Sequence, residues 1–376
     1  MHKQKSDVAT RETTPRSDKK SWHKPHIPAP LRHGATLFII AILVEYLVIP
    51  KLAIAGKHLN SLSRINPFWI IAGFLLEGAS LWAYAILSRS LLPTNPPKLF
   101  TIFRIDLAGN AIAHIVPGGT AGSAGLGFRL LTSRGVPKQD AAFAIATQGI
   151  GSAVVLNILL WISIFISIPI AGLHSAYESI ALLIGLIALL MIGILVFALV
   201  KGETVTTRIL QAIFRPIPKI TEEQVNRFVL KVSSSLRNLG GDRDRLKSAI
   251  FWAALNWLFD AASLWAFLAS FGHFVLPFEL FVAYGVANVM AVIPITPGGL
   301  LIVESVSSGL LASFGVPYSI ALLAVLGWRF VNYWLPIPLG TVAYISLRVE
   351  KGSRMRSGRK VIQEMAQEAH VTNPEG

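Results

Sequence analysis

The feature that most constrains this chain is a series of long apolar segments with almost no charge, such as residues 180–200 and 250–271. Each is close to the roughly 20 residues that a helix needs to cross about 30 Å of hydrocarbon. Of all residues, 53% are hydrophobic and 14% are charged, a balance that excludes an ordinary soluble fold. Lipid forces each spanning segment to satisfy its own backbone, and no alternating barrel pattern is present, so we predict an all-α polytopic membrane protein. About six full spans are expected, at residues 35–55, 67–88, 139–168, 179–200, 248–271 and 318–347.

The positive charge of the chain is concentrated in three segments that flank these spans. The net charge is +14, and Lys and Arg gather in residues 1–33, 201–248 and 348–376. Basic residues near span ends are retained inside, so we expect a disordered cytoplasmic arm, a cytoplasmic loop and a cytoplasmic tail on a protein of the cytoplasmic membrane. This distribution is typical of membrane topology, so no nucleic-acid partner is expected. Without cysteine, and with histidines scattered singly, the sequence predicts no metal site and no cofactor.

Two further apolar regions, residues 100–134 and 277–315, are each interrupted near the middle by Pro-Gly-Gly, at 117–119 and 297–299. Proline followed by glycine ends one helix and opens another. The arms that remain are about 16 residues long, which is short for a full crossing. Each region is therefore predicted to be a re-entrant helical hairpin that returns to the side from which it came.

Several motifs recur in the same order in the two halves of the chain. The pentapeptide Ala-Ser-Leu-Trp-Ala occurs twice, each time just after an acidic residue, and each Pro-Gly-Gly is followed at equal spacing by Gly-Val-Pro. Three matches in one order predict a duplication. An odd number of spans between equivalent points inverts the second copy, as in many secondary transporters. The predicted copies are residues 67–200 and 249–347, joined by the loop 201–248, within a membrane domain of residues 34–347.

The second copy carries the motifs of a known family. They are Ile-Pro-Ile-Thr-Pro-Gly-Gly at 293–299, then Glu304, Gly-Val-Pro at 315–317, and Trp-Arg-Phe-Val-Asn-Tyr-Trp at 328–334. Over about residues 34–347 the chain resembles the lysylphosphatidylglycerol synthase transmembrane-region family, which includes the flippase half of the bacterial multiple-peptide-resistance protein. The resemblance implies movement of a phospholipid or lipid-linked intermediate. It does not imply aminoacyl transfer, which resides in a separate catalytic domain of full-length relatives.

Family members also accompany glycosyltransferases. The resemblance therefore makes an isoprenoid-linked lipid an alternative substrate, and a glycosyltransferase or another envelope enzyme a possible partner.

Arg329 and Glu304 are charged residues at membrane depth, where each charge costs about 2.5 to 3.5 kcal/mol on insertion scales. One hypothesis is that Arg329 binds the phosphate of the lipid and that Glu304 orients the phosphate or exchanges with it. The alternative is a buried ion pair that only fixes the fold.

Glu77 and Asp260 lie near the centres of equivalent spans. They are candidates for lining a polar cavity between the repeats or for carrying a coupling proton. The alternative is that each bonds to a neighbouring helix for structural reasons.

In the first hairpin, Asp106, Asn110 and His114 recur every four residues and so share one helical face. A polar face on a re-entrant arm would suit the path of a headgroup. The alternative is a face satisfied by the opposing arm, with His114 as a hydrogen-bonding core residue.

The glycines of the two breaks, Gly118, Gly119, Gly298 and Gly299, are further candidates, because a helix that begins inside the membrane offers free N–H groups to an anion. Thr296 is placed to cap the second of these helices. Close helix packing is the alternative reading of the glycines.

Together these features predict a lipid translocase that is not an enzyme. The headgroup would cross a polar groove between the hairpins while the acyl or isoprenoid tails stay in lipid. The alternative function is a non-transporting membrane scaffold that recruits a lipid- or glycan-modifying enzyme. No nucleophile and base set is visible, which disfavours catalysis within the membrane.

Overall fold

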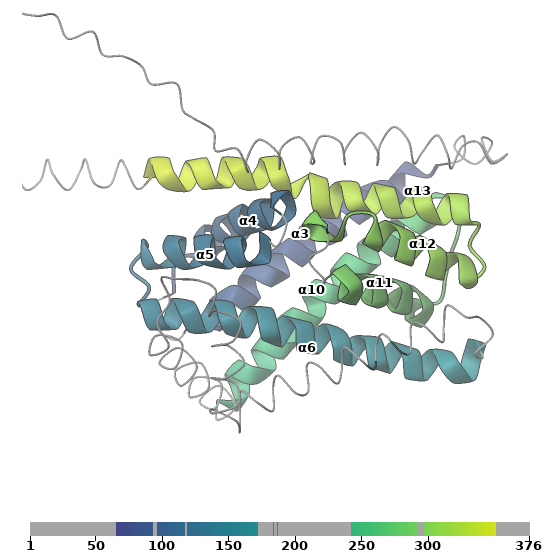
Figure 1. The fold of residues 1–376 in the computed structure, drawn as a ribbon, viewed down its shortest axis with the longest axis horizontal. Helices are drawn as coiled ribbons and strands as arrows, with labels where there is room; N and C mark the ends of the chain where they lie inside the picture. Colours follow the sequence, from purple (N-terminus) through teal and green to yellow (C-terminus); the bar gives the residue numbers. More distant parts are fainter. Residues whose placement is uncertain are drawn as a thin grey trace, which may run out of the picture.

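The computed structural model describes residues 65–92, 96–116, 119–171, 242–291 and 296–350, together with Leu183 and Leu186 (Figure 1). Within this part of the chain every regular element is a helix. The predicted arm 1–33 lies outside the described residues, as do nearly all of the loop 201–248 and all of the predicted tail 348–376 beyond Glu350.

Four helices are long and apolar enough to span a membrane. They are α3 (Pro67–Ser90), α6 (Lys138–Ala171), α10 (Arg243–Ser270) and a helix of 33 residues that begins as α13 (Tyr318–Arg329) and runs to Glu350. Four of the six predicted spans are thus confirmed as helices of spanning length. The other two, at 35–55 and 179–200, lie outside the described residues, apart from Leu183 and Leu186.

The first Pro-Gly-Gly region forms a pair of short helices, α4 (Leu99–Ile115) and α5 (Gly119–Thr132), that pack on each other (Figure 1). A Cβ on Gly119 would lie 2.6 Å from the carbonyl oxygen of Ile112, so this glycine permits the close contact of the two arms. Pro117 and Gly118 lie outside the described residues.

The second region forms α11 (Pro277–Ala291) and α12 (Ile302–Ser313), with a short 3₁₀ turn at Pro297–Gly299 between them. The break is longer than expected, because α12 begins three residues after the Pro-Gly-Gly motif and not within it. Gly298 has a φ of 55° and Leu301 a φ of 69°, and these left-handed conformations interrupt the helical path.

The helices α3 and α10, which carry the repeated pentapeptide, pack along each other and form reciprocal hydrogen bonds. The hydroxyl of Ser80 donates to the carbonyl oxygen of Asn256 at 3.0 Å, and that of Ser263 donates to the carbonyl oxygen of Gly73 at 2.9 Å. Ser80 and Ser263 are the same position of the pentapeptide, and each carbonyl lies seven residues before the equivalent serine. Equivalent residues of the two motifs therefore make the same contact in both directions.

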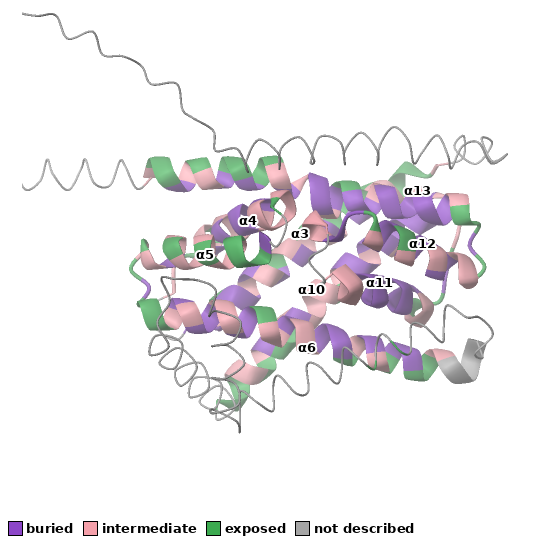
Figure 2. Ribbon diagram, viewed as in Figure 1, coloured by how far each residue is buried: buried purple, intermediate pink, exposed green. Residues whose placement is uncertain are grey.

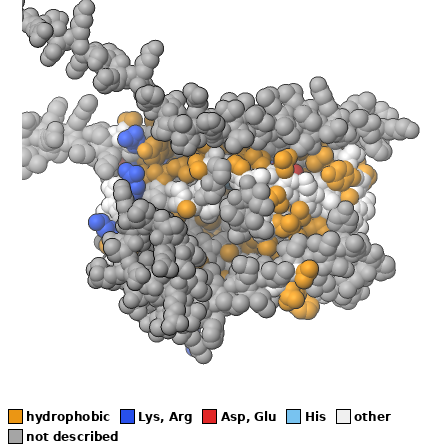
Figure 3. Space-filling model, in the orientation of Figure 1, with side chains coloured by type: hydrophobic (Ala, Val, Ile, Leu, Met, Phe, Trp, Pro, Cys, Tyr) orange, Lys and Arg blue, Asp and Glu red, His pale blue; other side chains and the backbone are white. Residues whose placement is uncertain are grey.

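The long helices carry exposed residues along their outer sides (Figure 2), and Figure 3 shows hydrophobic side chains at the surface. Side chains such as Leu75 on α3 and Phe165 on α6 are about two-thirds exposed, at 70% and 67%. Lys and Arg side chains gather at one end of the molecule, on the left of Figure 3. A multi-pass membrane protein is expected to show this pattern, because lipid covers the apolar belt and water covers the charged end.

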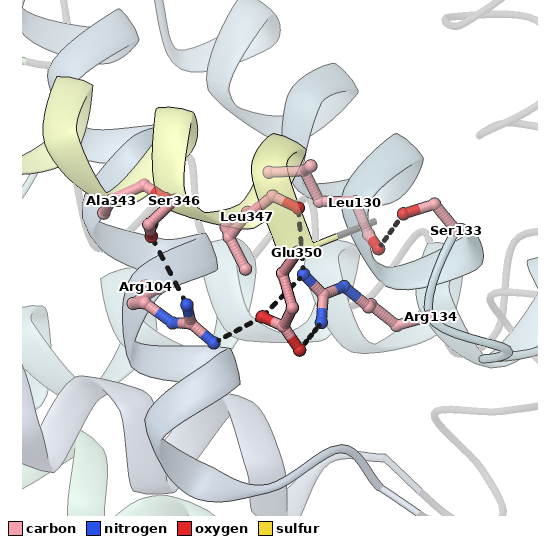
Figure 4. Close-up of polar contacts among 8 residues, drawn as sticks. All are labelled: Arg104, Leu130, Ser133, Arg134, Ala343, Ser346, Leu347 and Glu350. Carbon is pink, nitrogen blue, oxygen red and sulfur yellow. Dashed lines mark hydrogen bonds and ion pairs between the residues drawn. The ribbon is translucent and has the colours of Figure 1, made fainter. Parts of the chain in front are cut away.

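Two arginines of the first hairpin bind the last residue of the long C-terminal helix (Figure 4). The guanidinium of Arg104 on α4 lies 3.0 Å from the carboxylate of Glu350, and that of Arg134, just after α5, also lies 3.0 Å from it. Arg104 further donates to the hydroxyl of Ser346, and Arg134 donates to the carbonyl oxygen of Leu347. These contacts attach both arms of the hairpin to one helix end.

Replacing Glu350 by Gln is expected to destabilise the protein by about 1 kcal/mol, because two half-buried arginines lose their shared carboxylate. The unfolding midpoint of the purified protein in detergent measures this, with Arg348→Gln on the same helix turn as an exposed control. A Glu350→Gln midpoint no lower than that of the control would contradict the role given to this contact.

Candidate functional site

The segment 328–334 of the last helix is the centre of the candidate site. Its residues Phe330–Trp334 form a turn of π-helix, a distortion that is frequent at functional sites. Trp328 and Asn332 reach one group of buried polar residues, whereas Arg329 and Tyr333 reach another. The segment 328–334 thus connects two groups of buried polar residues.

The group that Arg329 and Tyr333 reach, which we call the ion-pair cluster, is built around Arg329. Arg329 is 3% exposed and Glu304 on α12 is 1% exposed, and the Nε of the arginine donates to Oε1 of the glutamate at 2.5 Å. The Nη2 of Arg329 donates to the carbonyl oxygen of Gly298 at 3.0 Å. The guanidinium also lies over the ring of Tyr333, 4.4 Å from its centroid. The sequence therefore predicted two residues that do meet, and the charge of each is balanced by the other.

Tyr333 also connects the broken regions of the two hairpins. Its hydroxyl donates to the carbonyl oxygen of His114, at the end of α4, at 2.6 Å, and lies 3.2 Å from that of Pro297. The ring of His114 stacks on that of Tyr333, and its Nδ1 donates to the Tyr333 carbonyl oxygen at 3.1 Å. Gly298 packs so closely on the Tyr333 ring that a Cβ there would overlap it. The last turn of α4 and the break of the second hairpin therefore meet at one buried side chain.

The group that Trp328 and Asn332 reach, the carboxyl cluster, brings Glu77 of α3 and Asp260 of α10 together at the side-chain nitrogen of Asn332, which donates to both. Asp260 accepts hydrogen bonds from Tyr284 at 2.7 Å, Trp328 at 2.7 Å and Asn332 at 3.1 Å. Glu77 accepts one from Asn332, at 3.3 Å. The two equivalent acidic residues thus share one place in the fold but have unequal surroundings.

The predicted polar face of α4 is divided between different neighbours. Asp106 accepts a hydrogen bond from Ser88 of α3 at 2.7 Å, and Ser88 in turn accepts one from Gln148 of α6. His114 instead binds Tyr333, and Asn110, which lies between Asp106 and His114 on this face of the helix, is half-buried. Among the described residues, Asp106 and His114 thus bind partners on α3 and on the last helix rather than on the opposing arm α5.

The break residues of the second hairpin present an acceptor to Arg329, through the carbonyl of Gly298. Gly299, with a φ of 72°, packs against Ala291. Thr296 precedes the 3₁₀ turn, but its hydroxyl donates to the carbonyl oxygen of Leu300 at 2.9 Å, so the predicted capping bond is not formed. The reason is that α12 begins at Ile302, too far along the chain for Thr296 to cap it.

Four residues of the two clusters were not predicted as site residues: Tyr284, Trp328, Asn332 and Tyr333. Three of them belong to the motif 328–334, and their spacing is the signal that could have found them. Trp328 and Asn332 are four residues apart, as are Arg329 and Tyr333, so each pair shares a helical face.

Chemically, the arrangement offers a guanidinium that can bind a phosphate and a pair of carboxyls that can hold a proton. Among the described residues no group of three or more His, Asp or Glu is placed to bind a metal ion. Fold and site together define a polytopic helical membrane protein with a buried charged centre.

The chain belongs to the family described as the lysylphosphatidylglycerol synthase TM region, which it matches over residues 35–340. It is 21% identical over 332 residues to a UPF0104 membrane protein of Methanothermobacter thermautotrophicus, covering 83% of this chain and 95% of that relative. A UPF0104 membrane protein of Methanocaldococcus jannaschii is 29% identical over 102 residues, 27% of this chain and 30% of the relative. These names specify a membrane protein and no activity.

Proposed function

We propose that this protein moves a phospholipid or a lipid-linked intermediate across the cytoplasmic membrane without changing it chemically. The observation that carries the proposal is the place of Arg329, a buried cation at the point where the last turn of α4 meets the break of the second hairpin. An ionised group in such a place is functional by default, and guanidinium is the side chain best suited to phosphate.

In this mechanism the carboxylate of Glu304 stays paired with the guanidinium of Arg329 until a headgroup arrives. The phosphate then replaces the carboxylate on the guanidinium, and the hairpin ends separate at Tyr333 so that the headgroup passes between them. The hydrophobic tails stay in the surrounding lipid throughout. The carbonyl of Gly298 holds one nitrogen of Arg329 in place during the exchange.

We also propose that the two halves form an inverted repeat. The reciprocal bonds of Ser80 and Ser263 are those expected of equivalent helices across a two-fold axis. The pairs α4–α5 and α11–α12 occupy opposite halves of the molecule in Figure 1. The end that carries the exposed Arg89, Lys98 and Arg129 would face the cytoplasm, and the other hairpin would enter from outside.

The experiment that tests the proposal measures lipid movement in proteoliposomes. Fluorescent phospholipids and an isoprenoid phosphate are incorporated into both leaflets, and an impermeant reductant then bleaches the outer leaflet. We expect the protein to make inner-leaflet probe accessible for at least one lipid class, whereas protein-free liposomes lose only the outer-leaflet signal. Equal bleaching with and without protein for both classes would contradict a translocase and favour a scaffold.

A further inference from the structure

Two buried carboxyl groups in contact cannot both be ionised at low cost, because like charges repel strongly where water is excluded. Glu77 and Asp260 are 2% and 7% exposed, and both accept a hydrogen bond from the same nitrogen, Nδ2 of Asn332, at 3.3 and 3.1 Å. Arg329, which shares the segment 328–334 with the donors to Asp260, is already paired with Glu304. A proton between the two carboxyls is the simplest group that makes their contact favourable.

The hydrogen bonds show which of the two carboxyls holds this proton. Asp260 accepts from three donors, on both of its oxygens, as a carboxylate does. Glu77 accepts only from Asn332, on Oε1, and its Oε2 is buried and receives no hydrogen bond from a donor among the described residues. An unpartnered buried oxygen is costly unless it carries a proton that it can donate.

We propose that Glu77 and Asp260 form a proton-binding site, in which Glu77 holds one proton and donates it to Asp260, and that this proton exchanges when lipid moves. The second half of this statement rests on the proposed function. The polar and charged groups next to this site are Tyr284 on α11, Arg329 and Asn332 on the last helix, and Glu304 on α12. On α4, Asp106 and His114 bind other partners. On α6, Lys138 and Asp140 lie in the first turn.

The link to lipid movement follows from the segment 328–334. Trp328 and Asn332 bind Asp260, and Arg329 and Tyr333 from the same turn hold Glu304 and the two hairpins. A shift of this turn that frees Arg329 for a phosphate also withdraws donors from Asp260. Asp260 then becomes the better proton acceptor, so we expect a second proton to be taken up as the anion binds and released as it leaves.

The proton site is tested first by infrared spectroscopy of the purified protein in detergent at neutral pH. The C=O stretch of a buried protonated carboxyl is separate from the bands of carboxylates and shifts in D₂O. We expect this band in the wild type, its loss in Glu77→Gln and its retention in the control Glu279→Gln. Absence of the band in the folded wild type, or its full retention in Glu77→Gln, would overturn the assignment.

A second pair of variants tests which residue holds the proton, by thermal unfolding. Gln at position 77 can still donate to Asp260, so the unfolding midpoint of Glu77→Gln should stay near that of the wild type. Asp260→Asn replaces one acceptor oxygen with an NH2 group that faces a hydrogen-bond donor. The unfolding midpoint of this variant should therefore be clearly lower than that of the wild type. The reverse order would overturn the assignment of the proton to Glu77.

The coupling is tested in proteoliposomes with a pH gradient imposed in either direction. We expect the gradient to change the rate of lipid movement by wild-type protein and to leave that of Glu77→Gln unchanged. An equal change of rate in the wild type and in Glu77→Gln, or no change of rate in either protein, would overturn the coupling. If the wild type moves no lipid at all, the proposed function fails, and the infrared result still decides on the proton site.

Discussion

Replacing both members of the ion pair in one chain, with Glu304→Gln and Arg329→Gln, is expected to leave a folded protein that moves lipid much more slowly than the wild type. Neither single change is as informative. Breaking a buried pair on one side leaves an uncompensated charge and costs about 3 to 5 kcal/mol, enough to unfold many proteins. Two neutral amides can hydrogen-bond to each other at this place, so the double variant avoids that penalty.

The expected loss of transport follows from the bond between guanidinium and phosphate. A hydrogen bond to a charged group contributes about 1.5 to 3 kcal/mol, and about 1.4 kcal/mol corresponds to a factor of ten. The rate of lipid movement should therefore fall by about 10- to 100-fold in the assay with fluorescent lipids. Far-ultraviolet circular dichroism and the unfolding midpoint establish that the variant is folded.

The matched control is Asp244→Asn with Arg348→Gln, which also removes one acid and one base, both exposed. It should transport as the wild type does. Wild-type transport by the double variant of the ion pair would show that Glu304 and Arg329 only fix the fold. That result would remove Arg329 from the mechanism.

The long helices could be predicted because hydropathy is a local property of the chain. Residues 67–88 and 318–347 are apolar over a spanning length, and both are helical in the structure. The break at Pro297 was also predictable from its proline and glycines. Its length was not, because it depends on Leu301 adopting a left-handed conformation that leucine rarely has.

The candidate site was partly predictable, because charges in apolar segments are rare and need partners. Arg329 and Glu304 are such charges, and the structure pairs them. The contact between Glu77 and Asp260 depends on α3 packing against α10, which is a tertiary property that hydropathy does not contain. Tyr333 was missed for a related reason. An aromatic residue in a spanning helix is common, and only the tertiary structure shows that its hydroxyl binds the carbonyl oxygens of His114 and Pro297.

The charges Arg104 and Arg134 show the limit of reading topology alone. Basic residues near the end of a membrane helix indicate the cytoplasmic side, but this rule does not predict that both arginines contact Glu350. That contact joins residues more than two hundred positions apart in the chain.

The central claim is that the headgroup passes between the ends of the two hairpins, where Tyr333 now joins them. The direct test is to tie these ends together reversibly. Val116, at the end of α4, and Thr296, before the 3₁₀ turn, flank the residues that Tyr333 contacts. The chain has no cysteine, so Val116→Cys with Thr296→Cys provides two unique thiols for a short reducible cross-linker.

We expect the cross-linked double-cysteine protein to stop moving lipid and to recover when the linker is reduced. Each single-cysteine variant, treated in the same way, should keep its activity. Lipid movement at an undiminished rate while the two hairpin ends are covalently joined would contradict the proposed path.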